Sequence, residues 1–199
     1  MSSIEFYYDF GSPNAYLVNC VLPGIAARHS KNLIYKPMLL GGVFKATNNR
    51  APMQTYGDVR NKLPYLGLEM QRFCERFGTS FAMNPHFPVN TLNVMRGAMY
   101  AEGKPWENSY IQAIFDALWL EGSDTSDAQT LSKFLAQASL PVDEILTAIQ
   151  NPAIKEMLIG ATEDAVTAGV FGAPSVIYDG ELFFGKDALD DLDWRLGQT

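Results

Sequence analysis

The sequence has little cysteine and little histidine, and neither occurs in a recurring spacing. Cys20 and Cys74 are the two cysteines of the 199 residues, and His29 and His86 are the two histidines. The cysteines form no C-x-x-C pair, and no Cys/His group has zinc-ligand spacing. We therefore expect no disulfide framework and no metal site, which fits a reducing compartment.

Positive charge is also scarce. Fifteen basic residues face 22 acidic ones, so the net charge is −7, which opposes binding to nucleic acid phosphates. The uncharged stretch from Phe10 to Ala27 contains Pro13 and Pro23, so we do not expect it to span a membrane. The first residues lack the basic and apolar regions of a signal peptide. We expect a cytoplasmic protein with neither nucleic acid nor membrane as partner.

Several common catalytic signatures are missing as well. The chain contains no P-loop, no G-x-G-x-x-G fingerprint, no G-x-S-x-G elbow and no H-E-x-x-H pair. The usual nucleotide-binding, hydrolase and zinc-protease motifs therefore give no guide to function.

The first forty residues have the pattern of a strand, a helix and a second strand. Residues 4–9 are short and aromatic-rich, as in a strand. Ser12 then Pro13 is typical of a helix start, with the serine as N-cap. We expect this helix to reach Leu22, to kink or restart at Pro23 and to end near His29. A strand over 33–38 completes a βαβ unit with parallel strands.

The remaining chain is helical in the middle and returns to β structure at the end. Gly41-Gly42 and residues 47–52 have loop composition. Apolar stripes then predict helices through most of the region up to Ala168. Residues 175–178 and 182–184, separated by Asp179-Gly180, predict a hairpin followed by a last helix. The order predicts an α/β thioredoxin-like domain, residues 1–42 plus 169–199, with a large all-α insertion over residues 43–168.

This topology brings three candidate sites to one edge of the sheet. Ser12 lies at a helix N-terminus, which favours an anion such as a thiolate, although a serine there is often only a cap. Pro174 precedes a strand, and a cis bond after Ala173 would free its backbone groups to pair with an extended peptide, although trans is the common state. Lys186 and Asp187 open the last helix and suit an amino acid end, or only form an acidic first turn.

Three segments in this order resemble the DsbA-like 2-hydroxychromene-2-carboxylate isomerases and kappa-class glutathione transferases. They are Asp9 to Tyr16, Gly169 to Pro174 and Phe184 to Leu189. The resemblance covers essentially the whole chain and includes the helical insertion. It implies a thioredoxin-like domain that binds glutathione and forms a homodimer.

The resemblance also implies roles for individual residues. The catalytic residue is Ser12, whose hydroxyl would stabilise the glutathione thiolate. Asn49 matches the family asparagine that contacts the tripeptide, with Asn48 as the alternative register. The complete set implied to bind glutathione is Ser12, Asn14, Asn49, Ala173, Pro174, Lys186 and Asp187.

The activity implied is conversion of 2-hydroxychromene-2-carboxylate to trans-o-hydroxybenzylidenepyruvate, a step of aromatic hydrocarbon catabolism. Two alternatives stay open: a kappa-type glutathione transferase or peroxidase, and a thioredoxin-like binding module without turnover. The partner of the aromatic carboxylate also stays open among Lys36, Arg50 and Lys62.

Overall fold

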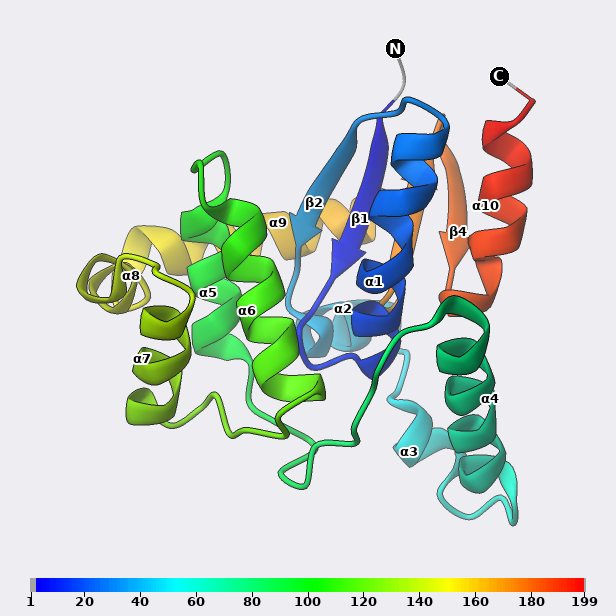
Figure 1. Ribbon diagram of the computed structural model, residues 1–199, viewed down its shortest axis with the longest axis horizontal. Coiled ribbons are helices and arrows are strands. Elements are labelled where there is room, and N and C mark those ends of the chain that lie inside the picture. The colour runs from blue at the N-terminus through cyan, green and yellow to red at the C-terminus, as the bar shows by residue number, and fades with distance from the viewer. Residues whose placement is uncertain (1–2, 199) are drawn as a thin grey trace.

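The centre of the computed structural model, which describes residues 3–198, is a four-stranded sheet with the order β2-β1-β3-β4 (Figure 1). Strands β1 and β2 are parallel, whereas β3 runs antiparallel to β1 and to β4. The predicted mixed sheet from both ends of the chain is confirmed. Its strands are β1 (Ile4–Tyr8), β2 (Leu33–Pro37), β3 (Ser175–Tyr178) and β4 (Glu181–Phe184).

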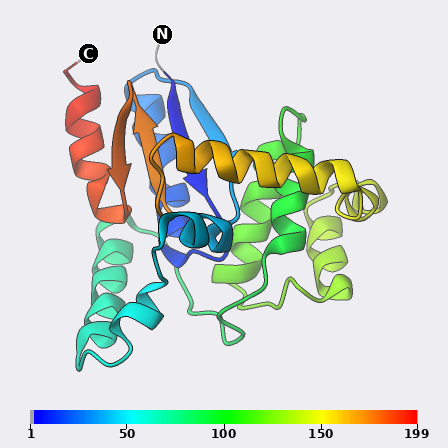
Figure 2. The ribbon, with the colours of Figure 1, turned by 180° about the vertical axis from the view of Figure 1, so that it is seen from behind.

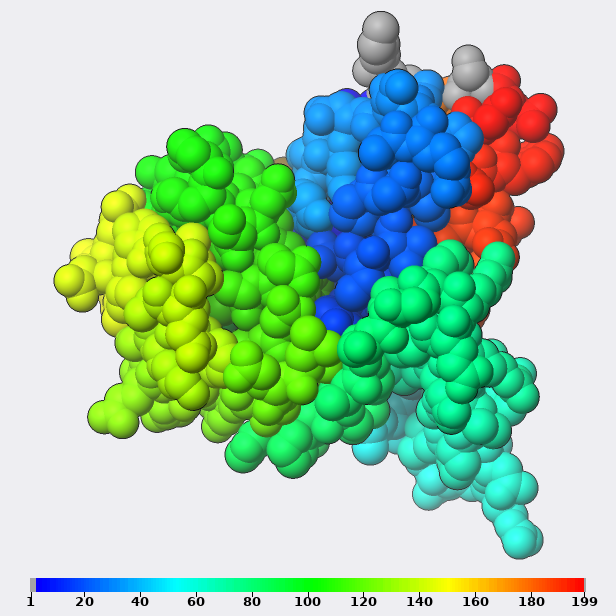
Figure 3. Space-filling model, viewed as in Figure 1, coloured from blue at the N-terminus to red at the C-terminus, as the bar shows by residue number. Residues whose placement is uncertain are grey.

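Helices cover both faces of this sheet and form a block beside it. Helix α1 lies over one face, and α9 crosses the opposite face with α2 below it (Figure 2). Helices α5 to α8 stand beside the sheet, and α3 and α4 project from the body (Figure 3). The bounds are α1 (Pro13–Arg28), α2 (Leu40–Thr47), α3 (Pro52–Tyr56), α4 (Lys62–Phe77), α5 (Leu92–Ala101), α6 (Glu107–Trp119), α7 (Ala128–Gln137), α8 (Val142–Ala148), α9 (Pro152–Thr167), the short 3-10 helix η1 (Lys186–Ala188) and α10 (Leu189–Leu196).

The helix after β1 begins where the sequence predicts. Ser12 is extended and caps α1, with Pro13 at the first helical position. The predicted restart at Pro23 is wrong, because α1 continues through this residue to Arg28. The hairpin between β3 and β4 is confirmed, and both turn residues, Asp179 and Gly180, have the positive φ that a two-residue turn requires.

The glycine pair of the predicted loop lies inside a helix. Gly41 and Gly42 belong to α2, so the loop prediction is wrong there. The Leu40 N–H donates to the buried carboxylate of Asp9 at 2.8 Å, and the Leu39 N–H donates to Thr162 Oγ1 at 3.0 Å. These tertiary bonds fix the start of α2, and they override the weak helix propensity of glycine.

One hydrophobic cluster joins the sheet to the helical block. The ring of Phe115 on α6 lies 5.8 Å from that of Tyr8 and 4.8 Å from that of Phe10.

The division into residues 1–42 with 169–199 and residues 43–168 stays a prediction. Among the described residues, no helix is both long and apolar enough to cross a membrane.

Trp119 connects this cluster to the turn before α1, and its replacement by phenylalanine tests the connection. Its side chain is completely buried, and Nε1 donates to the Phe10 carbonyl at 2.8 Å. Trp119→Phe leaves that carbonyl without a donor, so we expect a loss of about 2 kcal/mol in unfolding free energy. Urea denaturation measures the loss. Trp194→Phe is the matched control, because Trp194 is 67% exposed; equal stability of the two variants would contradict the role of the bond.

Candidate functional site

Ser12 occupies the turn between β1 and α1, where it makes two hydrogen bonds of opposite sense. Its Oγ accepts from the Ala15 N–H at 3.2 Å and donates to the Ala173 carbonyl at 3.1 Å. The side chain is 5% exposed. The hydroxyl therefore acts as a helix cap through its lone pair, while its proton faces the segment before β3.

The N-terminal end of α1 gives this position a positive electrostatic character. Pro13 has no N–H and the Ala15 N–H already bonds Ser12, so the helix dipole and the remaining Asn14 N–H are what favour negative charge there. Ser12 Oγ is thus both the helix cap and the atom that can donate a hydrogen bond to an anion. The chemistry available is donation of one hydrogen bond to an anion, since Ser12 Oγ has a single proton.

Asp9 is a buried carboxylate that holds the turn in place. Its Oδ1 accepts from the Gly11 N–H at 2.9 Å and from Thr91 Oγ1 at 2.8 Å, and its Oδ2 accepts from the Leu40 N–H. Burial raises the pKa of Asp9, and these hydrogen bonds oppose the rise. One side chain thus ties the Ser12 turn to the starts of α2 and α5.

The segment before β3 lies directly against Ser12. The Ala173–Pro174 bond, for which the sequence left both states open, is cis in the structure. The Pro174 carbonyl accepts from the Gly185 N–H at 3.0 Å. Within residues 3–198 the Ala173 N–H has no hydrogen-bond acceptor, so it is a free donor beside Ser12.

The two asparagines of the predicted set differ in what they contact. Asn49 Nδ2 donates to the Phe171 carbonyl at 2.8 Å, which attaches the end of α2 to the segment before β3. Asn48 has a positive φ and ends α2. Asn14 Oδ1 is buried without a hydrogen-bond partner among the described residues. An orphaned acceptor of this kind requires a donor from elsewhere.

Lys186 and Asp187 form an ion pair at the start of η1. Lys186 Nζ lies 2.6 Å from Asp187 Oδ1, and the two side chains are 6% and 77% exposed respectively. The Asp187 carboxylate is therefore open to a second cation from solvent. The Gly185–Pro174 bond places this pair close to the cis bond.

Two of the three cations predicted as carboxylate partners contact other side chains. Lys36 lies 4.0 Å from Glu5 on the neighbouring strand, and Lys62 lies over the rings of Tyr56 and Tyr65 on the projecting α3–α4 segment. Arg50 is exposed after α2. The sequence reasoning also gave no role to Asp9, although a lone carboxylate after an aromatic strand was a usable signal.

A family comparison agrees with the geometry of this domain. The family model described as a DSBA-like thioredoxin domain matches residues 3–197. The chain belongs to this family. The predicted thioredoxin-like fold is thereby confirmed.

Individual relatives narrow the comparison. The chain is 27% identical over 191 residues to a 2-hydroxychromene-2-carboxylate isomerase of Sphingobium xenophagum, with 96% of each chain covered. It is 25% identical over 214 residues to human glutathione S-transferase kappa 1, covering 98% of this chain and 91% of the relative. A solved structure of 2-hydroxychromene-2-carboxylate isomerase superimposes with a TM-score of 0.87 at 25% identity, covering 98% and 94%. The predicted resemblance is confirmed, and these named enzymes support membership of an enzyme family of isomerases and transferases.

Proposed function

We propose that the protein is a glutathione-dependent isomerase that converts 2-hydroxychromene-2-carboxylate to trans-o-hydroxybenzylidenepyruvate. The observation that carries the proposal is the Ser12 hydroxyl, which caps α1 with its proton facing Ala173 at 3.1 Å. Thioredoxin-like redox enzymes place a nucleophilic cysteine at this position. A serine there is suited to stabilising the thiolate of a bound ligand instead of forming a disulfide itself.

The free polar groups around Ser12 fit a peptide thiol. The Ala173 N–H is an unpaired donor, and Asn14 Oδ1 is a buried acceptor without a partner. An extended tripeptide carries both carbonyl acceptors and amide donors, so it satisfies groups of either kind. The exposed Asp187 carboxylate adds a partner for the ammonium of a γ-glutamyl end.

Bound glutathione supplies a thiolate nucleophile that is regenerated at the end of the isomerisation. Ser12 would release the Ala173 carbonyl and donate its hydrogen bond to that sulfur, and the α1 N-terminus would lower the energy of the anion. The hydrogen bonds of Asp9 hold the turn that carries Ser12. Ala173 and Asp187 fix the orientation of the ligand, which raises the effective concentration of the nucleophile.

The alternative supported by a specific observation is a kappa-type glutathione transferase, since a relative of that name matches over nearly the whole chain. An absorbance assay on 2-hydroxychromene-2-carboxylate with and without glutathione distinguishes the two functions. Isomerisation consumes no glutathione, whereas conjugation consumes one equivalent. Absence of any turnover, with glutathione still bound, would support a binding module instead. We also propose that the protein is a cytoplasmic homodimer. Light scattering measures its oligomeric state.

Removal of the Asp187 carboxylate is expected to weaken glutathione binding about fivefold. The carboxylate is 77% exposed and shared with Lys186, so its contribution is that of an exposed pair, about 1 kcal/mol. Calorimetry on Asp187→Ala measures the change. Because Lys186 is buried and loses its partner in this variant, the double variant Lys186→Met with Asp187→Ala is the control. Restored affinity in the double variant would show that the unpaired lysine, and not a lost ligand contact, caused the defect.

A further inference from the structure

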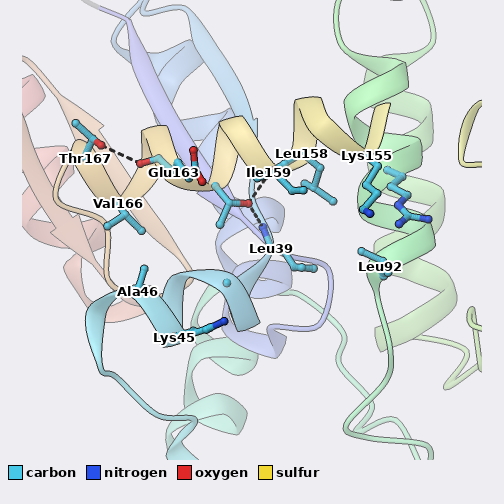
Figure 4. A pocket seen from close by; sticks show the side chains of 13 residues that line it. Leu39, Lys45, Ala46, Leu92, Lys155, Leu158, Ile159, Glu163, Val166 and Thr167 are labelled. Carbon is cyan, nitrogen blue, oxygen red and sulfur yellow. Dashed lines mark hydrogen bonds between the residues drawn. The ribbon is translucent and has the colours of Figure 1, made fainter. Parts of the chain in front are cut away.

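A cavity lies between α2, α5 and α9. It has a volume of about 760 Å³. Figure 4 shows α9 on one side of it, α2 on the other and α5 closing one end. None of the residues proposed to bind glutathione lines this cavity. We call it the α2–α9 cleft.

Three cations from three different helices line the α2–α9 cleft: Lys45 of α2, Arg96 of α5 and Lys155 of α9. None of them takes part in an ion pair within residues 3–198. The one acidic residue of the lining is Glu163. A chain with a net charge of −7 thus concentrates unpaired positive charge in one concave place.

Arg96 has an unsatisfied group inside the protein. Its Nη1 donates to the Ile149 carbonyl at 3.3 Å, whereas its Nε is buried without a hydrogen-bond partner among the described residues. The residue is half-buried, and it forms no ion pair with a carboxylate within residues 3–198. Because Nε is shielded from solvent, a ligand in the cleft meets Arg96 through the guanidinium N–H groups that do not bond Ile149.

The rest of the cleft surface is apolar. Leu39, Leu92 and Leu158 line it, together with Ile159, which is 42% exposed, and Val166. In Figure 4 the Lys45 and Lys155 side chains come from opposite sides of the gap, with the Leu92 side chain at the end that α5 closes. Apolar walls combined with a few convergent polar groups are the usual composition of a small-molecule site.

We propose that the α2–α9 cleft binds a small organic anion in which a carboxylate is joined to an apolar body. Arg96 donates to the carboxylate through the guanidinium N–H groups that do not bond Ile149, and Lys45 and Lys155 attract it by charge. The leucine side chains cover the apolar body. Binding here does not require glutathione, since Ser12 and Ala173 lie outside the lining.

Calorimetric titration with three probes tests the chemistry of the site. We expect 1-naphthoate to bind, 1-naphthylmethanol to bind at least tenfold more weakly because it lacks the charge, and inorganic phosphate to bind more weakly because it lacks the apolar body. Equal affinity for the acid and the alcohol would overturn the role of the cations. Preference for phosphate over the naphthoate would overturn the role of the apolar walls.

Variants locate the binding in the cleft. Arg96→Gln is expected to weaken 1-naphthoate binding about tenfold, the contribution of one hydrogen bond between charged groups. Because Arg96 also bonds to Ile149, the double variant Lys45→Gln with Lys155→Gln provides a test at exposed positions, with an expected weakening of about fivefold. Lys133→Gln removes one positive charge, as Arg96→Gln does, from the exposed face of α7 and serves as its control.

The outcomes separate this site from the Ser12 site. Ser12→Ala is expected to bind 1-naphthoate as the parent protein does. Weakened binding in Ser12→Ala with unchanged binding in the lysine double variant would place the naphthoate at the Ser12 site and overturn the proposal. An equal loss of 1-naphthoate affinity in Lys133→Gln would mean that the effect depends only on the net charge of the protein, and this result would overturn the proposal as well.

Discussion

Turnover of 2-hydroxychromene-2-carboxylate is expected to fall about 10- to 100-fold near neutral pH when Ser12 is replaced by alanine. The parent hydroxyl has one proton and, in the free protein, donates it to the Ala173 carbonyl at 3.1 Å. In the proposed complex it donates to the glutathione thiolate. Loss of a hydrogen bond to a charged group costs about 1.5–3 kcal/mol, which corresponds to this range of rates.

The same loss has a defined pH dependence. A donor stabilises the thiolate over the thiol, so its removal raises the pKa of the bound thiol by about one to two units. The deficit in turnover is therefore largest near neutral pH and becomes smaller as the pH rises toward the new pKa. Ultraviolet thiolate absorbance against pH, in parent and Ser12→Ala proteins saturated with glutathione, measures the shift. Identical titration curves would contradict the proposed role of Ser12.

A second substitution separates the cap from the donor. Alanine at an N-cap costs about 1 kcal/mol of stability, whereas glycine costs only a few tenths. Ser12→Gly and Ser12→Ala should therefore differ in unfolding free energy but lose turnover equally, because both lack the hydroxyl. If turnover instead follows stability in the two variants, Ser12 acts only as a helix cap.

Much of the fold was predictable because its signals are local. Ser12-Pro13 fixes the start of α1, and Asp179-Gly180 fixes the β3–β4 turn. Helix α2 was missed because its start depends on side chains far away in sequence: Asp9 is 31 positions from Leu40, and Thr162 is 123 positions from Leu39. No window around Gly41-Gly42 contains that information.

The sequence names some of the residues that the structure brings together at Ser12. The sequence indicates Ser12 and Ala173, and the structure joins them by a hydrogen bond across 161 positions. The sequence does not indicate Arg96 or Lys155 of the α2–α9 cleft, because the apolar stripes of their helices identify these helices only as core elements. Convergence of cations from α2, α5 and α9 is a tertiary property. Lys36, Arg50 and Lys62 were chosen by charge alone, without knowledge of which surface they occupy.

Asp9→Ala is expected to lower the unfolding free energy by about 3 kcal/mol at neutral pH. The substitution leaves the Gly11 and Leu40 N–H groups without an acceptor, and each unsatisfied buried donor costs about 1–3 kcal/mol. Relief of the buried charge offsets part of this cost. For a chain of this length the loss corresponds to a fall in melting temperature of about 6–12 °C, which calorimetry measures. Unchanged stability would show that the Ser12 turn and the starts of α2 and α5 do not depend on the Asp9 carboxylate.

Asp9→Asn keeps the shape of the side chain and removes its titration. Its Nδ2 group faces either the Leu40 N–H or the Gly11 and Thr91 donors, which adds a cost that does not vary with pH, so the electrostatic part is measured by the pH dependence of the deficit. Burial raises the pKa of Asp9 above its usual value of 3.8, so the folded protein holds this proton more tightly than the unfolded chain does. The stability that this pKa shift contributes is then fully present below pH 3.8 and is lost as the pH rises through the folded pKa, while the hydrogen bonds that Asp9 accepts remain. The variant's deficit relative to the parent should therefore be largest at acidic pH and become smaller toward neutral pH. Urea denaturation of both proteins across this range measures the difference. A deficit that grows with pH would mean that the hydrogen bonds from Gly11, Leu40 and Thr91 outweigh the burial of the charge.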